Sequence, residues 1–313
     1  MKIFITGGAG FIGSHIADRI LARGDMVMVI DNYSTGRRDN LTPNSNLKIV
    51  EGSIADTALV EELVSGFTPD VVIHAAASYK DPDNWEEDSR TNVLGTANVV
   101  KSSKRAGVKR LIYFQTALGY GLVPEEQPIT LKHRIKLEGS SYAISKTAGE
   151  SYIMLSGMDH ISFRLANAYG PRNLSGPLPT FFHRLTTGKK CFCMDTRRDF
   201  IYINDLVDVV IKAIDGIGRT GPYHISSGSD YSIKELFDET ISSLGITLDE
   251  PVDVTERNPD DVYTILLDPS ETEKDFNWKV STPLATGVNN TIEYYKKYGI
   301  TQTYTHLKQS DKE

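Results

Sequence analysis

The sequence predicts an α/β fold with a doubly wound parallel sheet and a smaller second α/β lobe. Short apolar stretches, at residues 2–5, 26–30, 47–50, 71–73 and 110–114, alternate with amphipathic stretches. Strands that alternate with helices are typical of a parallel sheet with helices on both faces. A glycine-rich turn follows the first stretch directly, and the length of 313 residues favours two lobes over one compact unit.

The glycine-rich turn, residues 6–13, reads T-G-G-A-G-F-I-G and is followed by an amphipathic stretch at residues 16–21. Gly7, Gly10 and Gly13 fit the pattern G-x-x-G-x-x-G. A strand, a glycine turn and a helix in this order open a dinucleotide-binding unit, because side chains at the turn would keep a diphosphate away from the backbone N–H groups. Glycine-rich turns also serve as structural bends, but the position directly after a strand favours cofactor binding.

The second apolar stretch ends at Asp31, at about the distance from the glycine turn where an acidic residue contacts the adenosine ribose. A carboxylate there accepts hydrogen bonds from the ribose hydroxyls and repels a 2′-phosphate, which favours NAD over NADP. Arg37 and Arg38 are able to bind a phosphate, but they come after Gly36 and we assign them to a solvated loop.

The predicted strand at residues 71–73 runs into Ala75, Ala76 and Ala77. Small residues beyond the carboxyl end of a strand allow a flat ligand to lie against the backbone, so these alanines are candidates for a cofactor cleft. Close packing of a helix on the sheet explains them equally well. A helix over residues 88–106 continues the alternation.

Chemistry-bearing residues follow the predicted strand at residues 110–114. Thr116 lies just beyond its end, and Tyr142 and Lys146 are spaced i, i+4 in a predicted helix that runs to about residue 156. The phenol and the ammonium therefore share one helix face. Because a nearby ammonium stabilises phenolate, we expect the pKa of Tyr142 to fall below its usual value of about 10 and the tyrosine to act as a base.

Composition argues against several classes of function. With 34 basic and 41 acidic residues, the net charge of −7 gives no basic footprint for nucleic acid. No apolar run approaches the roughly 20 residues of a membrane helix, and a strand that begins at residue 2 leaves no room for a leader. Cys191 and Cys193 are spaced C-x-C, which disfavours a bridge along a strand, and they have too few neighbouring ligands for a metal. We expect reduced thiols in a cytoplasmic protein.

With these motifs in order, the chain resembles the extended short-chain dehydrogenase/reductase family, and within it the nucleotide-sugar epimerases and dehydratases. The resemblance covers nearly the whole chain, up to about residue 298. It is carried by the glycine turn, the segment D-N-Y-S-T-G at 31–36, the T-N-V segment at 91–93, the Y-x-x-x-K pair, Y-G-P-R at 169–172, R-D-F-I at 198–201 and R-N-P-D-D at 257–261.

The resemblance implies a Rossmann sheet and an NAD-dependent enzyme that acts on a nucleotide sugar. It implies Thr116, Tyr142 and Lys146 as catalytic residues, of which Thr116 would hydrogen-bond the sugar hydroxyl that is oxidised. Tyr142 and Lys146 would also contact the cofactor. The other implied cofactor contacts are Gly7, Gly10, Phe11, Ile12, Gly13, Asp31, Asn32, Ser34, Thr35, Gly36, Ser53, Ile54, Ala75, Ala76, Ala77 and Asn92.

The substrate contacts that the resemblance implies are Lys80, Thr116, Asn167, Arg172, Arg198 and Arg257. Forked guanidinium groups suit diphosphate oxygens, which gives the arginines a physical reason to bind a nucleotide; the alternative for each is a surface ion pair. Lys80 falls in the family's sugar-facing loop and would meet a negatively charged sugar, although an exposed lysine without a role fits its position as well.

Several positions depart from the family pattern. Ser53 stands where the family has an aspartate against adenine, and Arg257 is offset by one residue from its proline. Ala117 and Leu118 follow Thr116, where the 4,6-dehydratases carry Asp and Glu, and the glutamate of the uronate decarboxylases is also absent. Because alanine and leucine exchange no proton, the pattern favours C4 epimerisation through a 4-keto sugar.

Two other readings of function stay open. A dehydratase, decarboxylase or reductase of nucleotide sugars would need a proton-transfer residue that the linear sequence does not reveal. A non-catalytic NAD-binding regulator would tend to lose the tyrosine or the lysine, and this chain has both. The sequence does not define the nucleotide or the sugar; family frequency favours UDP, carrying a hexose, an N-acetylhexosamine or a uronate.

The resemblance also implies how the chain is divided and assembled. Prolines at positions 171, 177 and 179 predict a loop over the substrate cleft. Helices at 88–106 and 142–156 from two copies would form a four-helix homodimer interface. The polar tail that ends at residue 313 is expected to be mobile. The expected division is an NAD-binding domain of residues 1–166 plus 204–226, and a nucleotide-sugar lobe of residues 167–203 plus 227–313.

Overall fold

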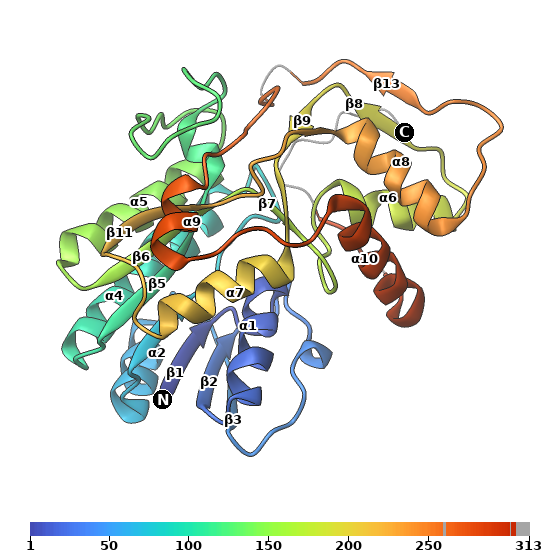
Figure 1. Cartoon of the computed structure of the whole chain (residues 1–313). Coiled ribbons are helices and arrows are strands. Elements are labelled where there is room, and N and C mark those ends of the chain that lie inside the picture. Colours follow the sequence, from blue (N-terminus) through green and yellow to red (C-terminus); the bar gives the residue numbers. More distant parts are fainter. Residues whose placement is uncertain (259–260, 301, 305–313) are drawn as a thin grey trace.

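The computed structural model describes residues 1–258, 261–300 and 302–304. Its centre is a seven-stranded sheet in the order β11-β6-β5-β4-β1-β2-β3, and every neighbouring pair of strands is parallel (Figure 1). The predicted α/β class with a parallel sheet is confirmed. These strands are β1 (Lys2–Thr6), β2 (Met26–Asp31), β3 (Leu47–Glu51), β4 (Val71–His74), β5 (Arg110–Thr116), β6 (His160–Leu165) and β11 (Gly221–Ile225).

Helices cover both faces of this sheet. On one face α1 (Phe11–Ala22) packs beside α7 (Ile203–Ile214); on the other lie α2 (Thr57–Phe67), α4 (Thr96–Arg105) and α5 (Ser141–Ser156). Along β1, Ile3 and Ile5 join the core under the first face, and Phe4 joins the core under the second. Successive side chains of a strand point to opposite faces, so a strand buried on both faces reads as one continuous apolar run.

The helix predicted over residues 88–106 begins earlier and is irregular. It consists of α3 (Trp85–Asp88), a π-helical stretch η2 (Ser89–Gly95) and α4. Asn92 lies in the middle of the π-helical stretch and is buried. π-helical turns are rare and concentrate at functional sites, which directs attention to Asn92.

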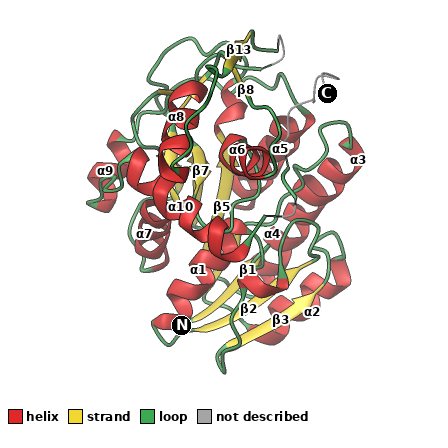
Figure 2. Ribbon diagram, turned by 90° about the vertical axis from the view of Figure 1, so that its right-hand side faces the viewer, coloured by secondary structure: helices red, strands yellow, loops and turns green. Residues whose placement is uncertain are grey.

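Apart from α9, which packs along β11, the remaining elements gather at the carboxyl ends of the central strands, away from the N-terminus (Figure 1). Three helices, α6 (Pro177–Thr186), α8 (Ile233–Leu244) and α10 (Leu284–Tyr298), pack on one another, and Figure 2 shows them above the central sheet. The smaller elements are β7 (Asn167–Tyr169) paired with β10 (Phe200–Tyr202), β9 (Arg197–Arg198) paired with β12 (Tyr231–Ser232), β8 (Phe192–Met194) paired with β13 (Asp253–Thr255), the 3-10 helices η1 (Arg38–Asn40) and η3 (Ala117–Tyr120), and α9 (Ser270–Phe276) against β11.

The segment with three prolines was predicted to be loop, and this prediction is wrong for two of them. Pro177 is the first residue of α6 and Pro179 lies in its first turn, whereas Pro171 is in a turn. The first N–H groups of a helix have no partner inside it, so proline is tolerated there. Residues 259–260 of the R-N-P-D-D segment and the polar tail at 305–313 lie outside the described residues.

Two predictions from composition concerned the cysteines and the absence of a membrane helix. Cys191 and Cys193 are both free and buried, at and beside β8. Burial raises the pKa of the Cys193 thiol to about 12, so the thiolate needed for nucleophilic chemistry is scarce at neutral pH. Within the part of the chain that the structure describes, no helix combines the length and the apolar character of a membrane span.

Candidate functional site

The glycine turn joins β1 to α1 through very close backbone contacts. Gly7 has a positive φ of 67°, and a Cβ there would come within 2.6 Å of the backbone N of Ala76. A Cβ at Gly13 would lie 2.3 Å from the carbonyl O of Gly7. Phe11 and Ile12 open α1, whose N-terminus has no side-chain cap, so its first N–H groups are available to an anion. The turn therefore fits the diphosphate of a dinucleotide.

Asp31 lies at the end of β2, beside the glycine turn. Its carboxylate accepts hydrogen bonds from the backbone N of Ala9, at 2.8 Å, and of Tyr33, at 2.8 Å. Burial raises the pKa of Asp31 above its usual value, and these hydrogen bonds oppose the shift. A carboxylate accepts about four hydrogen bonds, so Asp31 is able to hold the turn and still receive ribose hydroxyls.

The other predicted cofactor residues follow the ends of neighbouring strands. Asn32 Oδ1 accepts a hydrogen bond from the backbone N of Ser34 at 3.1 Å, and the backbone N of Ala76 donates to Thr6 Oγ1 at 3.2 Å. Parallel sheets bind ligands beyond the carboxyl ends of their strands, which is where these residues lie. They are Gly10 at the N-cap of α1, Asn32, Ser34, Thr35 and Gly36 after β2, Ser53 and Ile54 after β3, Ala75, Ala76 and Ala77 after β4, and Asn92 in η2.

A hydrogen-bond chain that the sequence did not reveal crosses this region. Thr6 Oγ1 and His74 Nδ1 are 2.7 Å apart, and His74 Nε2 and Thr96 Oγ1 are 2.8 Å apart. Thr96 donates to the carbonyl O of Asn92 at 2.6 Å, so it accepts from Nε2, and Nδ1 in turn accepts from Thr6. Burial lowers the pKa of His74 to about 3, which keeps the ring neutral, as this arrangement requires.

Asn92 extends this chain to α5. Its Oδ1 accepts from the backbone N of Ser78 at 2.8 Å, and its amide N donates to Ser78 O and to Ser145 Oγ, both at 3.0 Å. Ser145 Oγ donates to the carbonyl O of Tyr142 at 3.0 Å. Asn92 thereby holds the segment after β4 against the first turns of α5. This positioning role was not part of the sequence prediction.

The three predicted catalytic residues come from β5 and α5, which pack together. Thr116 is the last residue of β5, and its Oγ1 accepts a hydrogen bond from the backbone N of Leu118 at 3.2 Å. Tyr142 and Lys146 lie in the first two turns of α5. Lys146 is buried, and its Nζ lies 4.0 Å from the ring centre of Tyr113.

The pKa shifts at Tyr142 and Lys146 differ from the prediction. Burial raises the pKa of Tyr142 above its usual value, and nearby Tyr79 and Asp88 add to this shift. Burial lowers the pKa of Lys146 to about 7, partly offset by the Glu150 carboxylate. A lysine with this pKa is only partly charged at neutral pH. The predicted lowering of the tyrosine pKa is therefore wrong for this structure, because burial raises the pKa of Tyr142 instead.

Arg198 and Arg257 meet at one residue, Asp261. Arg198 Nη2 donates to both carboxylate oxygens of Asp261, at 2.7 and 2.9 Å, and Arg257 Nη1 donates to the carbonyl O of Asp261 at 2.7 Å. The Arg198 side chain is only 11% exposed and that of Asp261 3% exposed, so this pair is largely shielded from water. The structure brings the two predicted arginines together, and we call Arg198, Arg257 and Asp261 the arginine cluster.

Three other predicted substrate residues lie outside the arginine cluster. Arg172 forms an ion pair of 2.7 Å with Asp18 of α1, which places its guanidinium beside the helix that follows the glycine turn. The predicted contact of Arg172 with the substrate stays a prediction. Asn167 opens β7 and is exposed. Lys80 is exposed, with its Nζ 5.1 Å from the ring centre of Tyr304.

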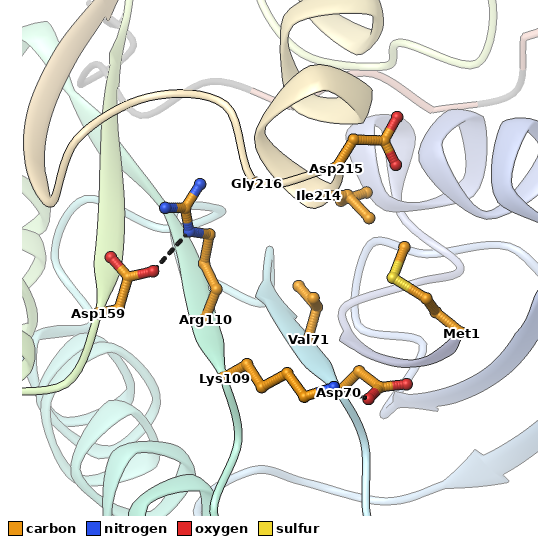
Figure 3. Close-up of a pocket in the computed structure, with 9 residues that line it drawn as sticks. All are labelled: Met1, Asp70, Val71, Lys109, Arg110, Asp159, Ile214, Asp215 and Gly216. Atoms are coloured by element: carbon orange, nitrogen blue, oxygen red, sulfur yellow. Dashed lines mark hydrogen bonds and ion pairs between the residues drawn. The ribbon is translucent and has the colours of Figure 1, made fainter.

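A cavity of about 370 Å³ opens at the opposite end of the central sheet (Figure 3). Its charged side chains are all paired: Lys109 with Asp70 at 2.9 Å, Arg110 with Asp159 at 2.8 Å, and Asp215 with Arg23 at 2.8 Å. The cavity lies at the amino ends of β4 and β5, whereas parallel sheets bind ligands beyond the carboxyl ends. We do not assign it to the functional site.

The parallel sheet, the glycine turn with Asp31 and the Tyr142–Lys146 pair define a dinucleotide-dependent enzyme of the short-chain dehydrogenase type. Residues 3–226 match the NAD-dependent epimerase/dehydratase family, and the chain belongs to that family. The family resemblance predicted from the sequence is confirmed, and so is NAD as the cofactor.

Solved structures and curated proteins include close relatives. The Bordetella bronchiseptica enzyme WbmH, crystallised with NAD+, is 51% identical with a TM-score of 0.93, covering 96% of this chain and 99% of that one. WbmG of the same organism, crystallised with NAD and UDP, is 45% identical with a TM-score of 0.91, covering 98% and 99%. The UDP-glucose 4-epimerase of Mycolicibacterium smegmatis is 30% identical over 323 residues, covering 95% and 99%.

Relatives at similar identity carry out other reactions. They include a dTDP-glucose 4,6-dehydratase of Streptomyces niveus, 28% identical, and UDP-glucuronic acid decarboxylase 1 of Arabidopsis thaliana, 27% identical. Family membership therefore defines an NAD-dependent epimerase or dehydratase type of enzyme, and the reaction itself has to be argued from the site.

Proposed function

We propose that the protein inverts C4 of a nucleotide sugar through a transient 4-keto sugar. The observation that carries this proposal is the pair Ala117 and Leu118, directly after Thr116. Ala117 is buried, and neither side chain is able to give or take a proton. Elimination of water needs an acid and a base beside the sugar in addition to Tyr142, and these two positions supply none.

The residues at the cofactor end fit NAD. A Cβ at Gly7 or Gly13 would collide with neighbouring backbone atoms, so this tight turn requires glycine, and the uncapped N-terminus of α1 suits a diphosphate. Asp31 lies where it would accept the ribose hydroxyls. When bound, NAD takes the hydride from C4 of the sugar and gives it back to the opposite face of the ketone.

Tyr142, Thr116 and Lys146 would handle the C4 hydroxyl. Tyr142 Oη takes the proton of that hydroxyl during oxidation and returns a proton during reduction. Thr116 Oγ1 hydrogen-bonds the same hydroxyl and orients it. Protonated Lys146 lowers the cost of a phenolate in a buried site, because opposite charges attract strongly where water is excluded. Between the two steps, the ketone turns within the site.

We propose that Asn167 and the arginine cluster hold the diphosphate of the nucleotide. Guanidinium groups bind diphosphate oxygens in pairs, and Arg198 and Arg257 are the predicted substrate arginines that the fold places together. Because both already bond to Asp261, ligand binding would exchange some of these bonds for phosphate contacts. The relative WbmG, crystallised with UDP, supports UDP as the nucleotide.

We also propose that the protein acts in the cytoplasm as a homodimer. The helical surface of α5 and the stretch before α4 exposes apolar side chains, notably Leu94, Ile144, Tyr152 and Leu155, and a second copy of the same surface would cover them. The two unbridged cysteines support a reducing compartment. Sedimentation velocity tests the assembly: Leu155→Glu should shift the protein from dimer to monomer, and a monomeric wild type would contradict the proposal.

The reaction is tested by incubating the protein with a panel of UDP-sugars in deuterated water and following the products by NMR. The expected result is the C4 epimer of one sugar, without deuterium at the carbons beside C4. Deuterium at those carbons, or loss of water or carbon dioxide, would instead identify a dehydratase or decarboxylase. Tightly bound NAD with no turnover of any sugar would favour a regulator.

A further inference from the structure

The proposed reaction gives no role to a buried ion pair that lies next to its residues. Glu150 of α5 and Arg164 of β6 are paired at 3.1 Å, with side chains 4% and 9% exposed. Arg164 Nε and Nη2 both donate to the Glu150 carboxylate, at 3.2 and 3.1 Å. Glu150 follows Lys146 by four residues in α5, so the two side chains lie one turn apart on the same face. The ion pair therefore joins the helix of the proposed catalytic residues firmly to the central sheet.

Tyr120 connects this ion pair to the segment after Thr116. It is the last residue of η3, which begins directly after Thr116, and it is fully buried. Arg164 Nη1 donates to Tyr120 Oη at 2.9 Å, and Tyr120 Oη lies 2.6 Å from His224 Nε2. His224 Nδ1 faces the carbonyl O of Asp268 at 3.0 Å, so Nδ1 carries the proton and Nε2 accepts from Tyr120. Burial lowers the pKa of His224 to about 4, which keeps the ring in this neutral form.

Gln115 makes the corresponding connection on the other side of Thr116. Its Oε1 accepts a hydrogen bond from the backbone N of Thr116 at 2.8 Å. Its amide N donates to Glu150 Oε2 and to Thr147 Oγ1, both at 3.4 Å, and Thr147 also belongs to α5. Thr116 thus lies between two side chains, of Gln115 and Tyr120, whose hydrogen bonds both lead to the carboxylate of Glu150.

We propose that Tyr120 and Gln115 are positioning residues, which hold Thr116 Oγ1 in register with Tyr142 by tying residues 115–120 to the Glu150–Arg164 ion pair. Thr116 and Tyr142 have to reach the same sugar hydroxyl, although one lies at the end of a strand and the other on a helix. A misplacement of about 1 Å in such an arrangement costs up to about a hundredfold in rate. This inference rests on the proposed role of Thr116 at the C4 hydroxyl.

The test is a double-mutant cycle on turnover, with the UDP-sugar that the wild type epimerises in the panel. Tyr120→Phe removes one hydroxyl, and Thr116→Val removes the group that is positioned. Tyr120→Phe should lower kcat about tenfold and leave the Kd of UDP unchanged, because UDP lacks the sugar that Thr116 contacts. In the Thr116→Val background it should lower kcat no further, since no hydroxyl is left to position. Gln115→Met should behave in the same way.

Tyr223→Phe is the matched control, because Tyr223 of β11 is also fully buried and also makes two hydrogen bonds through its hydroxyl. It donates to Asp275 Oδ2 at 2.5 Å and accepts from the backbone N of Arg219 at 3.0 Å, and neither of these bonds leads to Thr116. In urea this variant should lose about as much stability as Tyr120→Phe, but it should keep the wild-type kcat. An unchanged kcat in both variants would show that Tyr120 only supports the fold, and would overturn the proposal.

Amide hydrogen exchange, measured without sugar, tests the connection independently of the reaction. Loss of the Tyr120 hydroxyl should speed exchange in residues 117–121 about fivefold, and Tyr223→Phe should leave it unchanged. Unchanged exchange in Tyr120→Phe would overturn the proposal even if the wild type turned over no UDP-sugar, a result that would itself contradict the proposed function.

The cycle also separates the two proposals. A slow Thr116→Val with an equal loss from Tyr120→Phe in both backgrounds would overturn the positioning role alone. A fully active Thr116→Val would contradict the proposed role of Thr116, and the positioning role with it. If Tyr120→Phe fails to fold, Gln115→Met decides by the same cycle.

Discussion

The proposed catalytic end of the site, which we define as Thr116, Tyr142, Lys146 and Asn92, differs from the arginine cluster in how its polar groups are held. At the catalytic end the polar groups are held by neutral hydrogen bonds, such as those of Asn92 to Ser78 and Ser145. In the arginine cluster, the charged side chains of Arg198 and Asp261 are bonded to each other.

This difference shows what each region has to do when a ligand arrives. The catalytic end already has its geometry, and its two titratable groups carry pKa shifts caused by burial in a dry site. If the arginine cluster binds a diphosphate as proposed, it has to give up internal bonds first. We therefore expect substitutions at the first region to act on turnover, and those at the second to act on nucleotide affinity.

The largest effect is expected at Tyr142. Tyr142→Phe keeps the ring but removes the group that takes the C4 proton, so turnover should fall by about three orders of magnitude. NAD should remain bound, because the glycine turn and Asp31 are unchanged. Epimerisation is measured by NMR, and bound NAD by its absorbance after denaturation. Near-normal activity of this variant would remove Tyr142 from the mechanism.

Substitution of Lys146 should lower turnover and raise the stability of the fold. Its pKa is lowered from 10.5 to about 7, so the unfolded chain binds a proton between these pH values that the folded protein does not. Stability therefore rises with pH through this window, and below it the folded protein carries the full cost of a buried ammonium. Lys146→Met should reduce turnover about a hundredfold but raise the free energy of unfolding at pH 6 by about 2–4 kcal/mol.

Urea unfolding of wild type and Lys146→Met at pH 6 and pH 10 checks this prediction. The difference between the two proteins should shrink as pH rises from 6 to 10, because the folded wild type then buries a neutral amine and no longer an ammonium. If Lys146→Met were less stable than the wild type at pH 6, this would mean that Tyr113 and Glu150 stabilise the buried ammonium.

A smaller effect is expected at Asp261, on affinity. Asp261→Asn removes the charge that competes with a diphosphate for Arg198, so UDP should bind about threefold tighter, with turnover nearly unchanged. Isothermal titration with UDP measures this, and Asp195→Asn, at an exposed position shortly before Arg198 in the sequence, is the control. Weaker binding in Asp261→Asn would show that the carboxylate orients Arg198 for the ligand.

The smallest effect should come from Asp88. This residue is buried, its Oδ1 has no hydrogen-bond partner, and its charge helps to raise the pKa of Tyr142. Tyr79, Tyr113 and Lys146 also face Tyr142. Asp88→Asn should therefore move the acidic limb of the pH–rate profile down by about half a unit.

Glu86→Gln, at an exposed position of the same helix α3, should leave the profile in place. A profile of Asp88→Asn that stays in place, with only a lower rate at every pH, would mean that Asp88 supports the fold of α3 and α5 without acting on Tyr142.

The sequence predicted the features that depend on local spacing. The glycine turn, Asp31 and the alternation of strands and helices could be read because glycine positions and apolar runs are local patterns. The role of His74 could not be predicted, because its hydrogen-bond partners, Thr6 and Thr96, are distant from it in the chain. The π-helical stretch around Asn92 shows no distinct periodicity, so a regular helix was predicted in its place.

Charge states and ion pairs could not be predicted from local spacing. The spacing of Tyr142 and Lys146 correctly places both on α5, but the extent of burial, which reverses the expected pKa shift, depends on elements that pack around the helix. Arg172 was predicted from a motif, and its ion pair with Asp18 on α1 could not be predicted from that motif. A motif identifies a side chain, and the tertiary structure determines what that side chain contacts.

The central claim, reversible oxidation at C4 of the sugar, is tested most directly with a UDP-sugar deuterated at C4. The substrate identified by the panel is incubated with the protein in ordinary water until both epimers are present, and C4 is examined by NMR. The account predicts that deuterium remains at C4 in the product epimer. Replacement of that deuterium by solvent hydrogen, with inversion still taking place, would contradict it.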